Sequence, residues 1–207
     1  MFQLLSPYML KTYESCPKKF EFQYVKNISM PTDDDLFSVG KNIHALASYY
    51  LKKQDISKME ASLDDKEQVM WKYLKNLEYF DYTVIDTEYS LSTKIKSIFF
   101  GGRLDALVKK DDIFYILDYK TGSVPQNPKY DYQTIIYLLC VSKFFKQKNI
   151  SFVYIDLKNN QNHMINYDEE LEKEYTQKIT NICERIIKTQ TFNNIQKCKF
   201  CEYRKIC

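Results

Sequence analysis

Three segments rich in β-branched and aromatic residues follow one another in the middle of the chain, and they constrain its fold more than any other feature. They cover residues 83–92, 98–108 and 113–119, and Gly101-Gly102 and Lys109-Lys110-Asp111-Asp112 punctuate them. The connections between the segments are short, which favours antiparallel pairing because parallel strands need a long crossover. The chain therefore predicts three consecutive antiparallel strands.

Helical patterns surround these strands, and one further strand interrupts the second helical region. Helices, three strands, a helix, a strand and a final helix together predict an α/β fold, in which a mixed sheet of four or five strands is flanked by helices. Pro17 is expected to divide the first helix. The expected elements are helices over 7–26, 39–51, 66–80, 130–147 and 169–189, a loop over 30–35 and a fourth strand over 151–157.

Composition excludes several classes of protein. Only four glycines are present, and none has the spacing of a Walker A or dinucleotide-binding loop. The two histidines, His44 and His163, cannot form the H-E-x-x-H helix of a metalloprotease. The longest apolar run, Ile135–Val141, is far shorter than a membrane helix, and the first residues lack the features of a signal peptide. We expect a single soluble, cytoplasmic domain over residues 1–207, with no membrane partner.

The net charge of +3 is small, but positive charge is concentrated at the two ends of the chain. Residues 1–30 and 193–207 together carry an excess of five positive charges, which leaves −2 for the remainder. Two interpretations stay open on charge alone. The lysines are ordinary solvated side chains, or the ends meet and form a basic patch that suits nucleic acid.

An acidic and basic cluster is expected where two of the predicted strands lie side by side. Asp118 and Lys120 alternate along the third strand and therefore share a face. On the preceding strand, alternate apolar residues are expected to pack on one face: Leu104, Ala106 and Val108. Asp105 then points to the other face, toward Asp118. Two carboxylates suit Mg²⁺, and a nearby lysine suits phosphoryl chemistry, although a structural ion pair gives the same pattern.

Gly102-Arg103-Leu104-Asp105, followed by Asp118-Tyr119-Lys120, resembles the PD-(D/E)XK nuclease superfamily, and in particular its RecB-like exonuclease branch. Further motifs of that branch occur in the same order: Leu5-Ser6, Tyr13-Glu14-Ser15-Cys16-Pro17 with Phe20, Gly40 with His44, and Gln133 with Tyr137. The resemblance covers nearly the whole chain. It implies a restriction-endonuclease-like core.

The resemblance also implies roles for individual residues. The implied ligands of a catalytic Mg²⁺ or Mn²⁺ ion are His44, Asp105, Asp118 and the backbone carbonyl of Tyr119. Lys120 is the implied catalytic lysine, acting with the two aspartates. The residues implied to contact DNA or support the site are Gln133, Tyr137 and Glu88. Without the resemblance, the usual interpretation of His44 is a hydrogen-bonded structural histidine, and Gln133 and Tyr137 are ordinary residues of an amphipathic helix.

Four of the six cysteines have the spacing of a metal site. Cys198, Cys201 and Cys207 form a C-x2-C-x5-C array, which favours metal over disulfides, and Cys16 is the natural fourth ligand. The spacing alone is compatible with Zn²⁺ or an iron–sulfur cluster. The other two cysteines are expected to be small buried residues: Cys140 and Cys183.

Resemblance to the AddB-type nucleases and to the related CRISPR-adaptation nucleases implies a 4Fe-4S cluster on these four cysteines, with zinc as the alternative. The cluster would join residues 1–30 and 193–207 into an iron–sulfur subdomain beside a PD-(D/E)XK core over residues 39–190. It would also bring the two basic ends together.

These features predict a stand-alone metal-dependent DNA nuclease, an exonuclease that hydrolyses phosphodiester bonds at DNA ends in repair or recombination. No helicase motor is present, so a helicase or recombination partner would be a separate chain. Two alternatives remain: a CRISPR-adaptation nuclease that trims spacer precursors, and a catalytically silent module that binds DNA ends.

Overall fold

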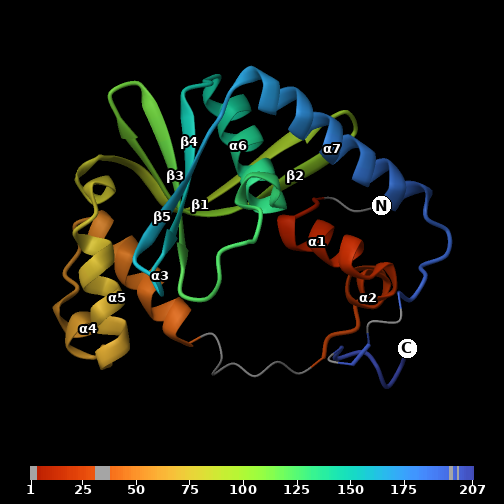
Figure 1. Cartoon of the computed structure of the whole chain (residues 1–207), viewed down its shortest axis with the longest axis horizontal. Helices are drawn as coiled ribbons and strands as arrows, with labels where there is room; N and C mark the ends of the chain where they lie inside the picture. Colours follow the sequence, from red (N-terminus) through yellow and green to blue (C-terminus); the bar gives the residue numbers. More distant parts are fainter. Residues whose placement is uncertain (1–3, 31–37, 196–197, 200) are drawn as a thin grey trace.

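A five-stranded mixed sheet forms the centre of the molecule (Figure 1). The computed structural model describes residues 4–30, 38–195, 198–199 and 201–207. The strands pair in chain order, antiparallel throughout except that β3 and β4 are parallel, as the helical crossover between them requires. The strands are β1 (Thr83–Ile95), β2 (Ile98–Lys110), β3 (Ile113–Lys120), β4 (Ile150–Asp156) and β5 (Gln161–Asn166).

The mixed α/β sheet is thus confirmed, and so are its first four strands. Strand β5 was not predicted from the sequence, because it is an edge strand in which Ile165 is the one buried residue. Its apolar content is too low for the alternating pattern that reveals a strand.

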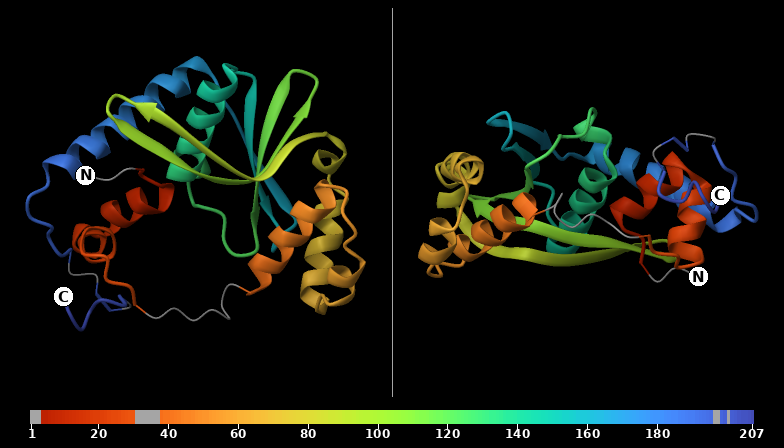
Figure 2. Two further views of the ribbon diagram at one scale, coloured as in Figure 1. Left: turned by 180° about the vertical axis from the view of Figure 1, so that it is seen from behind. Right: turned by 90° about the horizontal axis from the view of Figure 1, so that it is seen from below.

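Two groups of helices cover the two faces of the sheet. Successive side chains of β3 alternate between two apolar cores: Ile116 packs with the first group, and Leu117 packs with the second. The first group is α1 (Pro7–Ser15), α2 (Pro17–Phe20), α6 (Tyr132–Phe145) and α7 (Glu169–Lys188). The second group is α3 (Ser38–Leu51), α4 (Ser57–Ala61) and α5 (Asp65–Lys75). Figure 2 shows the second group and the chain ends at opposite ends of the sheet.

The first predicted helix is divided, as expected, and the division has a local cause. Cys16 is extended, with φ −164°, and the backbone N–H of Lys19 donates to its Sγ at 3.4 Å. Pro17 then occupies the first position of α2, where its missing N–H costs nothing. Ser6 caps α1 in the same way, and a π-helix over Glu21–Val25 follows α2.

Two other predicted helices are shorter than expected. The helix predicted over 66–80 ends at Lys75, and a separate 3-10 turn covers Glu78–Asp81. The helix predicted over 130–147 begins after Asp131, whose carboxylate accepts the Gln133 N–H, and ends at Lys146 in the left-handed conformation. Helix α4 was not predicted. The loop predicted over 30–35 lies outside the described residues after position 30.

Both chain ends are held against the body of the protein. Leu5 exchanges backbone hydrogen bonds with Phe99 and Gly101 of β2, at 2.9 and 3.2 Å. Near the other end, the ring of Tyr203 stacks on Phe22, and its hydroxyl donates to the Ile28 carbonyl at 2.8 Å. The C-terminal segment therefore lies beside the segment that follows α2. Among the described residues, no helix has the length and apolar character that crossing a bilayer requires.

Candidate functional site

The paired strands β1 and β2 change their packing at Glu88 and Asp105. Ala106 and Val108 pack in the core beneath α3 and α5, whereas Leu104 belongs to the opposite core. The expectation that Leu104, Ala106 and Val108 share one face is therefore wrong. The physical reason lies in β1, where Glu88 has φ +54° between Thr87, which is paired with Ala106, and Tyr89, which is paired with Leu104. This left-handed residue interrupts the regular pleat of the β1–β2 ribbon opposite Asp105, so the side chains on either side of Asp105 pack into different cores.

The side chain of Asp105, on β2, contacts both β3 and α3. Its Oδ2 accepts the backbone N–H of Tyr119 at 2.8 Å, and its Oδ1 lies 3.2 Å from His44 Nδ1. His44 Nε2 lies 2.9 Å from the Tyr119 carbonyl oxygen. Both ring nitrogens thus face acceptors, an arrangement that fits the doubly protonated imidazole. Burial lowers the pKa of His44, but the hydrogen bond and charge of Asp105 outweigh burial, so the pKa is raised.

Asp118, Lys120 and Gln133 form a second network on the α6 side of the sheet. Lys120 Nζ lies 2.6 Å from Asp118 Oδ2 and donates to Gln133 Oε1 at 3.0 Å, while Gln133 Nε2 donates to the other oxygen of Asp118. Asp118 and Lys120 share a face of β3, as the alternation predicts. Burial, together with the charge of Asp105, raises the pKa of Asp118 to about 7, against the opposing effect of Lys120.

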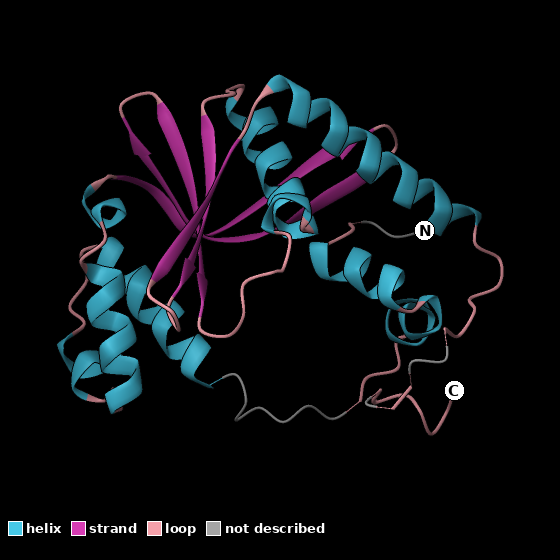
Figure 3. Cartoon of the chain, in the orientation of Figure 1, coloured by secondary structure: helices cyan, strands magenta, loops and turns pink. Residues whose placement is uncertain are grey.

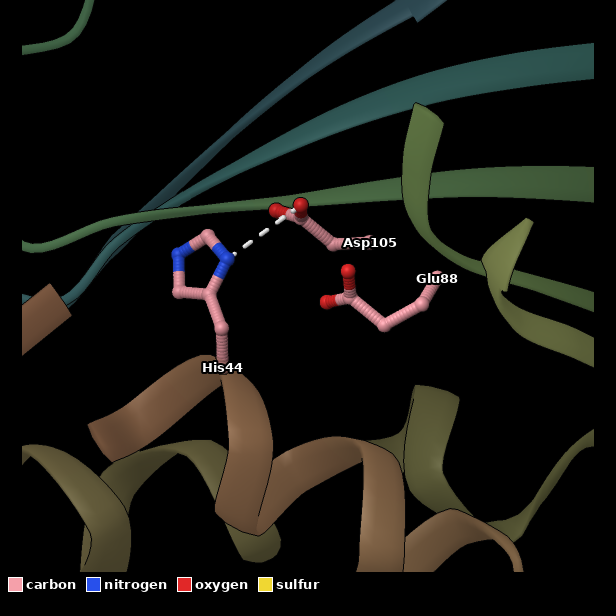
Figure 4. A group of neighbouring side chains, drawn as sticks. All are labelled: His44, Glu88 and Asp105. Carbon is pink, nitrogen blue, oxygen red and sulfur yellow. Dashed lines mark ion pairs between the residues drawn. The ribbon is translucent and has the colours of Figure 1, made fainter. Parts of the chain in front are cut away.

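A third acidic group lies beside Asp105. Glu88 points from β1 toward Asp105 and His44 (Figure 4), and the ligand atoms of these three residues lie within 4.8 Å of one another. Arg103 Nε lies 2.9 Å from Glu88 Oε2. Within the described part of the chain, this is the one group of histidine, cysteine and acidic residues compact enough to hold a metal ion. Asp118 is outside this compact group, and its carboxylate faces Lys120 and Gln133 instead.

Tyr137 lies one helical turn after Gln133 and contacts a different strand. Its hydroxyl donates to the Arg103 carbonyl at 2.9 Å. The contact depends on Gly102, because a Cβ at that position would lie 2.7 Å from Tyr137 Cε1. The aromatic ring therefore fixes the main chain of the Gly-Arg-Leu-Asp motif.

A cleft of about 1000 Å³ opens over these residues. Its walls come from α1, with Tyr8 and Lys11, from α3, with Lys41 and Tyr49, and from Lys52 directly after α3. The cleft is also lined by the site residues His44, Glu88, Arg103, Asp105, Gln133 and Tyr137. Asp118 and Lys120 do not line it, which leaves Gln133 as the member of their network that reaches the cleft.

The sequence analysis did not identify the cleft face of α3 or its aromatic residues. The signal was present, since Lys41, His44 and Ser48 recur at helical spacing opposite the apolar stripe. Tyr8 and Tyr49, which face the cleft from its two walls, are 56% and 46% exposed. Nothing in the sequence separates them from the other sixteen tyrosines.

The four cysteines of the predicted cluster line one cavity of about 290 Å³ between α2 and the C-terminal segment. The Asn194 amide bridges two of them, donating to Cys207 Sγ at 3.1 Å and accepting from Cys198 at 3.3 Å. No three of the four sulfur atoms lie within 4.8 Å of one another. Cys140 and Cys183 are buried elsewhere, as predicted, and burial raises the pKa of both thiols to about 12.

Comparisons with known proteins agree with this architecture. A family model described as the PD-(D/E)XK nuclease superfamily matches residues 4–83 and 68–207. Among solved structures, a protein from Eubacterium rectale described as a candidate exonuclease is 10% identical with a TM-score of 0.60, over 97% of this chain and 88% of that one. SSO0001 is 17% identical with a TM-score of 0.50, over 100% of this chain and 86% of that one. At such identities the likeness shows the fold alone. The curated proteins contain no match.

Proposed function

The chain belongs to the PD-(D/E)XK nuclease superfamily, whose members hydrolyse phosphodiester bonds, and on this premise we propose that it is a metal-dependent DNA exonuclease acting at DNA ends in repair or recombination. One observation carries the proposal. Asp105 lines the cleft on β2, while Asp118 and Lys120 on the neighbouring strand β3 are linked to the cleft through Gln133.

We assign the divalent ion, Mg²⁺ or Mn²⁺, to His44, Asp105, Asp118 and the Tyr119 carbonyl. The donor set fits such an ion, because carboxylate and carbonyl oxygens are preferred ligands of hard cations and one imidazole suits Mn²⁺. Asp105 contacts both His44 and the backbone of Tyr119, so three of the four donors already surround one small region. The ion would supply Lewis acidity to the phosphate and to the attacking water.

Lys120 is assigned the catalytic lysine. Its ammonium has three N–H donors, and Asp118 and Gln133 accept two of them. We assign the third to the scissile phosphate or to the attacking water, where a positive group stabilises developing negative charge. Gln133 is a positioning residue, because its amide holds both Asp118 and Lys120 in place.

The DNA would lie along the cleft face of α3. Lys41 and Lys52 stand on either side of His44, and no ion pair joins either lysine to another described residue. They are therefore suited to contact phosphates. Tyr8 and Tyr49 offer exposed rings on facing walls, and unpaired bases at a DNA end stack well on such rings.

We further propose that residues 1–30 and 193–207 form an iron–sulfur subdomain beside a core over residues 39–190, in a single domain over 1–207. The shared cavity of Cys16, Cys198, Cys201 and Cys207 supports this. A tetrahedral zinc ion with bonds of about 2.3 Å would hold four sulfur atoms about 3.8 Å apart. We assign a 4Fe-4S cluster to these four thiolates, with zinc as the alternative, since both accept four cysteine ligands.

The test is digestion of end-labelled DNA by anaerobically purified protein in Mg²⁺ or Mn²⁺. Lys120→Ala should reduce the cleavage rate by about 10⁴-fold, because general acid–base and electrostatic contributions of this size are typical of one catalytic group. The matched control is Lys143→Ala, which removes an exposed lysine of α6 outside the cleft and should leave the rate unchanged. A Lys120→Ala protein with the wild-type rate would reject the assignment. Binding of DNA ends without cleavage by the wild type would favour the silent module.

A further inference from the structure

Three carboxylates in the cleft or next to it are each paired with a basic side chain. The pairs are Asp118 with Lys120, Asp105 with His44, and Glu88 with Arg103. A cation paired with a carboxylate competes with a metal ion for the same oxygen atoms, so each pair must be loosened when metal binds. The basic partners differ in access. The Arg103 side chain is 67% exposed, against 24% for Lys120 and 28% for His44.

Arg103 has a main chain held in place by its neighbours and a side chain that is exposed to solvent. Tyr137 holds its carbonyl oxygen, and the close contact of Tyr137 with Gly102 leaves the adjoining backbone little room to move. The guanidinium lines the cleft and contacts Glu88 through Nε at 2.9 Å. A guanidinium group binds a phosphate with two parallel N–H bonds, which is a better match than its single ion-pair contact with Glu88.

Glu88 is held where its carboxylate can serve the metal. Its left-handed backbone conformation costs energy in a residue with a side chain, and such conformations persist where the surroundings impose them. The carboxylate points toward His44 and Asp105 (Figure 4), with ligand atoms within 4.8 Å of theirs. The partner that neutralises Glu88 in this structure is Arg103.

We propose that Arg103 is a substrate-operated latch on Glu88. In the free protein Arg103 holds the carboxylate. A DNA phosphate that enters the cleft draws the guanidinium away, and Glu88 then becomes a further ligand of the metal ion. The inference rests on the proposed nuclease function. It predicts that DNA and the divalent ion each tighten the binding of the other, because coupling between two sites is reciprocal.

The experiment measures Ca²⁺ affinity of the full chain by calorimetry, with and without a saturating short single-stranded oligonucleotide, whose integrity is checked on a denaturing gel. In the wild type, the oligonucleotide should tighten Ca²⁺ binding about tenfold. Arg103→Gln should bind Ca²⁺ about as tightly without the oligonucleotide as the wild type does with it. The oligonucleotide should then add less than about twofold.

Two further variants separate the latch from general charge effects. Lys52→Gln removes the same charge from the same cleft, so it should weaken binding of the oligonucleotide yet keep the tenfold coupling. Glu88→Gln should weaken Ca²⁺ binding and abolish the coupling. Arg103 and Lys52 are exposed, and thermal unfolding followed by circular dichroism checks that each variant is folded.

Two results would overturn the latch: Arg103→Gln with wild-type Ca²⁺ affinity in the absence of DNA, or Arg103→Gln with coupling equal to that of Lys52→Gln. Arg103 would then hold Glu88 and a phosphate at the same time. If the wild type cleaves DNA in Mg²⁺ but shows no coupling, the latch alone fails. If the wild type neither cleaves DNA nor binds Ca²⁺, the nuclease proposal fails with it.

Discussion

The cleft floor and the cysteine cavity are both expected to hold metal, yet the chain builds them in different ways. At the cleft floor, strands β2 and β3 and helix α3 carry the donors, and the backbone of Tyr119 itself bonds to Asp105 and His44. At the cavity, three of the four cysteines come from a C-terminal segment that forms turns without a helix or strand in its described residues (Figure 3). The first site is arranged by the fold. The second, on our proposal, would be completed only when its ligand binds.

In its described residues, the C-terminal segment contacts the rest of the protein through side chains rather than through a backbone ladder. Tyr203 is 2% exposed and stacks on Phe22, while Glu202 pairs with Lys19 at 3.0 Å. The carboxylate of Glu202 is 40% exposed, so this pair contributes little on its own. The buried ring of Tyr203 therefore contributes more to the attachment than this ion pair does. A bound cluster would add four covalent ligands to it.

The largest effect that separates the two regions is expected from Cys201→Ser. Loss of one thiolate should remove the cluster and its visible absorbance, and should lower the free energy of unfolding by roughly 4–5 kcal/mol, by analogy with a disulfide that closes a long loop. Urea unfolding and iron analysis measure the two effects. The control is Cys183→Ala, which should retain all of the iron because this cysteine of α7 is buried in the apolar core, away from the cysteine cavity. Loss of iron with unchanged stability would show that the fold alone secures the C-terminal segment.

A pH-dependent effect is expected at the cleft floor from Asp118→Asn. The pKa of Asp118 is raised from 3.8 to about 7, so the unfolded chain releases this proton first as the pH rises. In metal-free protein, the contribution of Asp118 to stability is therefore lost between about pH 4 and pH 7. The loss is at most about 4 kcal/mol. Urea unfolding in EDTA should show a steeper fall for the wild type than for Asp118→Asn. Parallel pH profiles would contradict a raised pKa.

A smaller effect is expected from Gly102→Ala, which tests how closely the fold sets the cleft floor. The added methyl would meet the ring of Tyr137, whose side chain is buried. Overpacking of this kind costs about 1–3 kcal/mol. Thermal unfolding measures the cost, and the double variant Gly102→Ala with Tyr137→Leu should recover part of it, since the two residues are in contact. A Gly102→Ala protein as stable as the wild type would show that the motif backbone can shift.

Prediction from the sequence succeeded where periodicity and local chemistry coincide. Strand alternation correctly placed Asp118 and Lys120 on one face, and Pro17 correctly predicted the division of the first helix. It failed at Leu104, because a single left-handed residue on the neighbouring strand reverses the alternation. No sequence pattern reports such a conformation at a glutamate.

The compact grouping of Glu88 with His44 and Asp105 also lay beyond sequence reasoning, although all three residues had been identified as candidates. Their grouping depends on how far β1 and β2 twist before they meet α3. The pairing of Arg103 with Glu88 depends on the same twist. Local patterns state which residues share a face, whereas distances between elements follow from packing of the whole domain.

Helix α3 presents its buried side to one core and its polar side to the cleft, with Ile43 and His44 as neighbours in the chain. Each residue of an α-helix turns by about 100° from the one before. Insertion or deletion of one residue between Gly40 and His44 would therefore aim the imidazole away from Asp105 and drive a polar residue into the apolar interior. Changes in chain length near this helix are tolerable only beyond its ends, so the spacing of the Gly40 and His44 motif is a mechanical necessity of the domain.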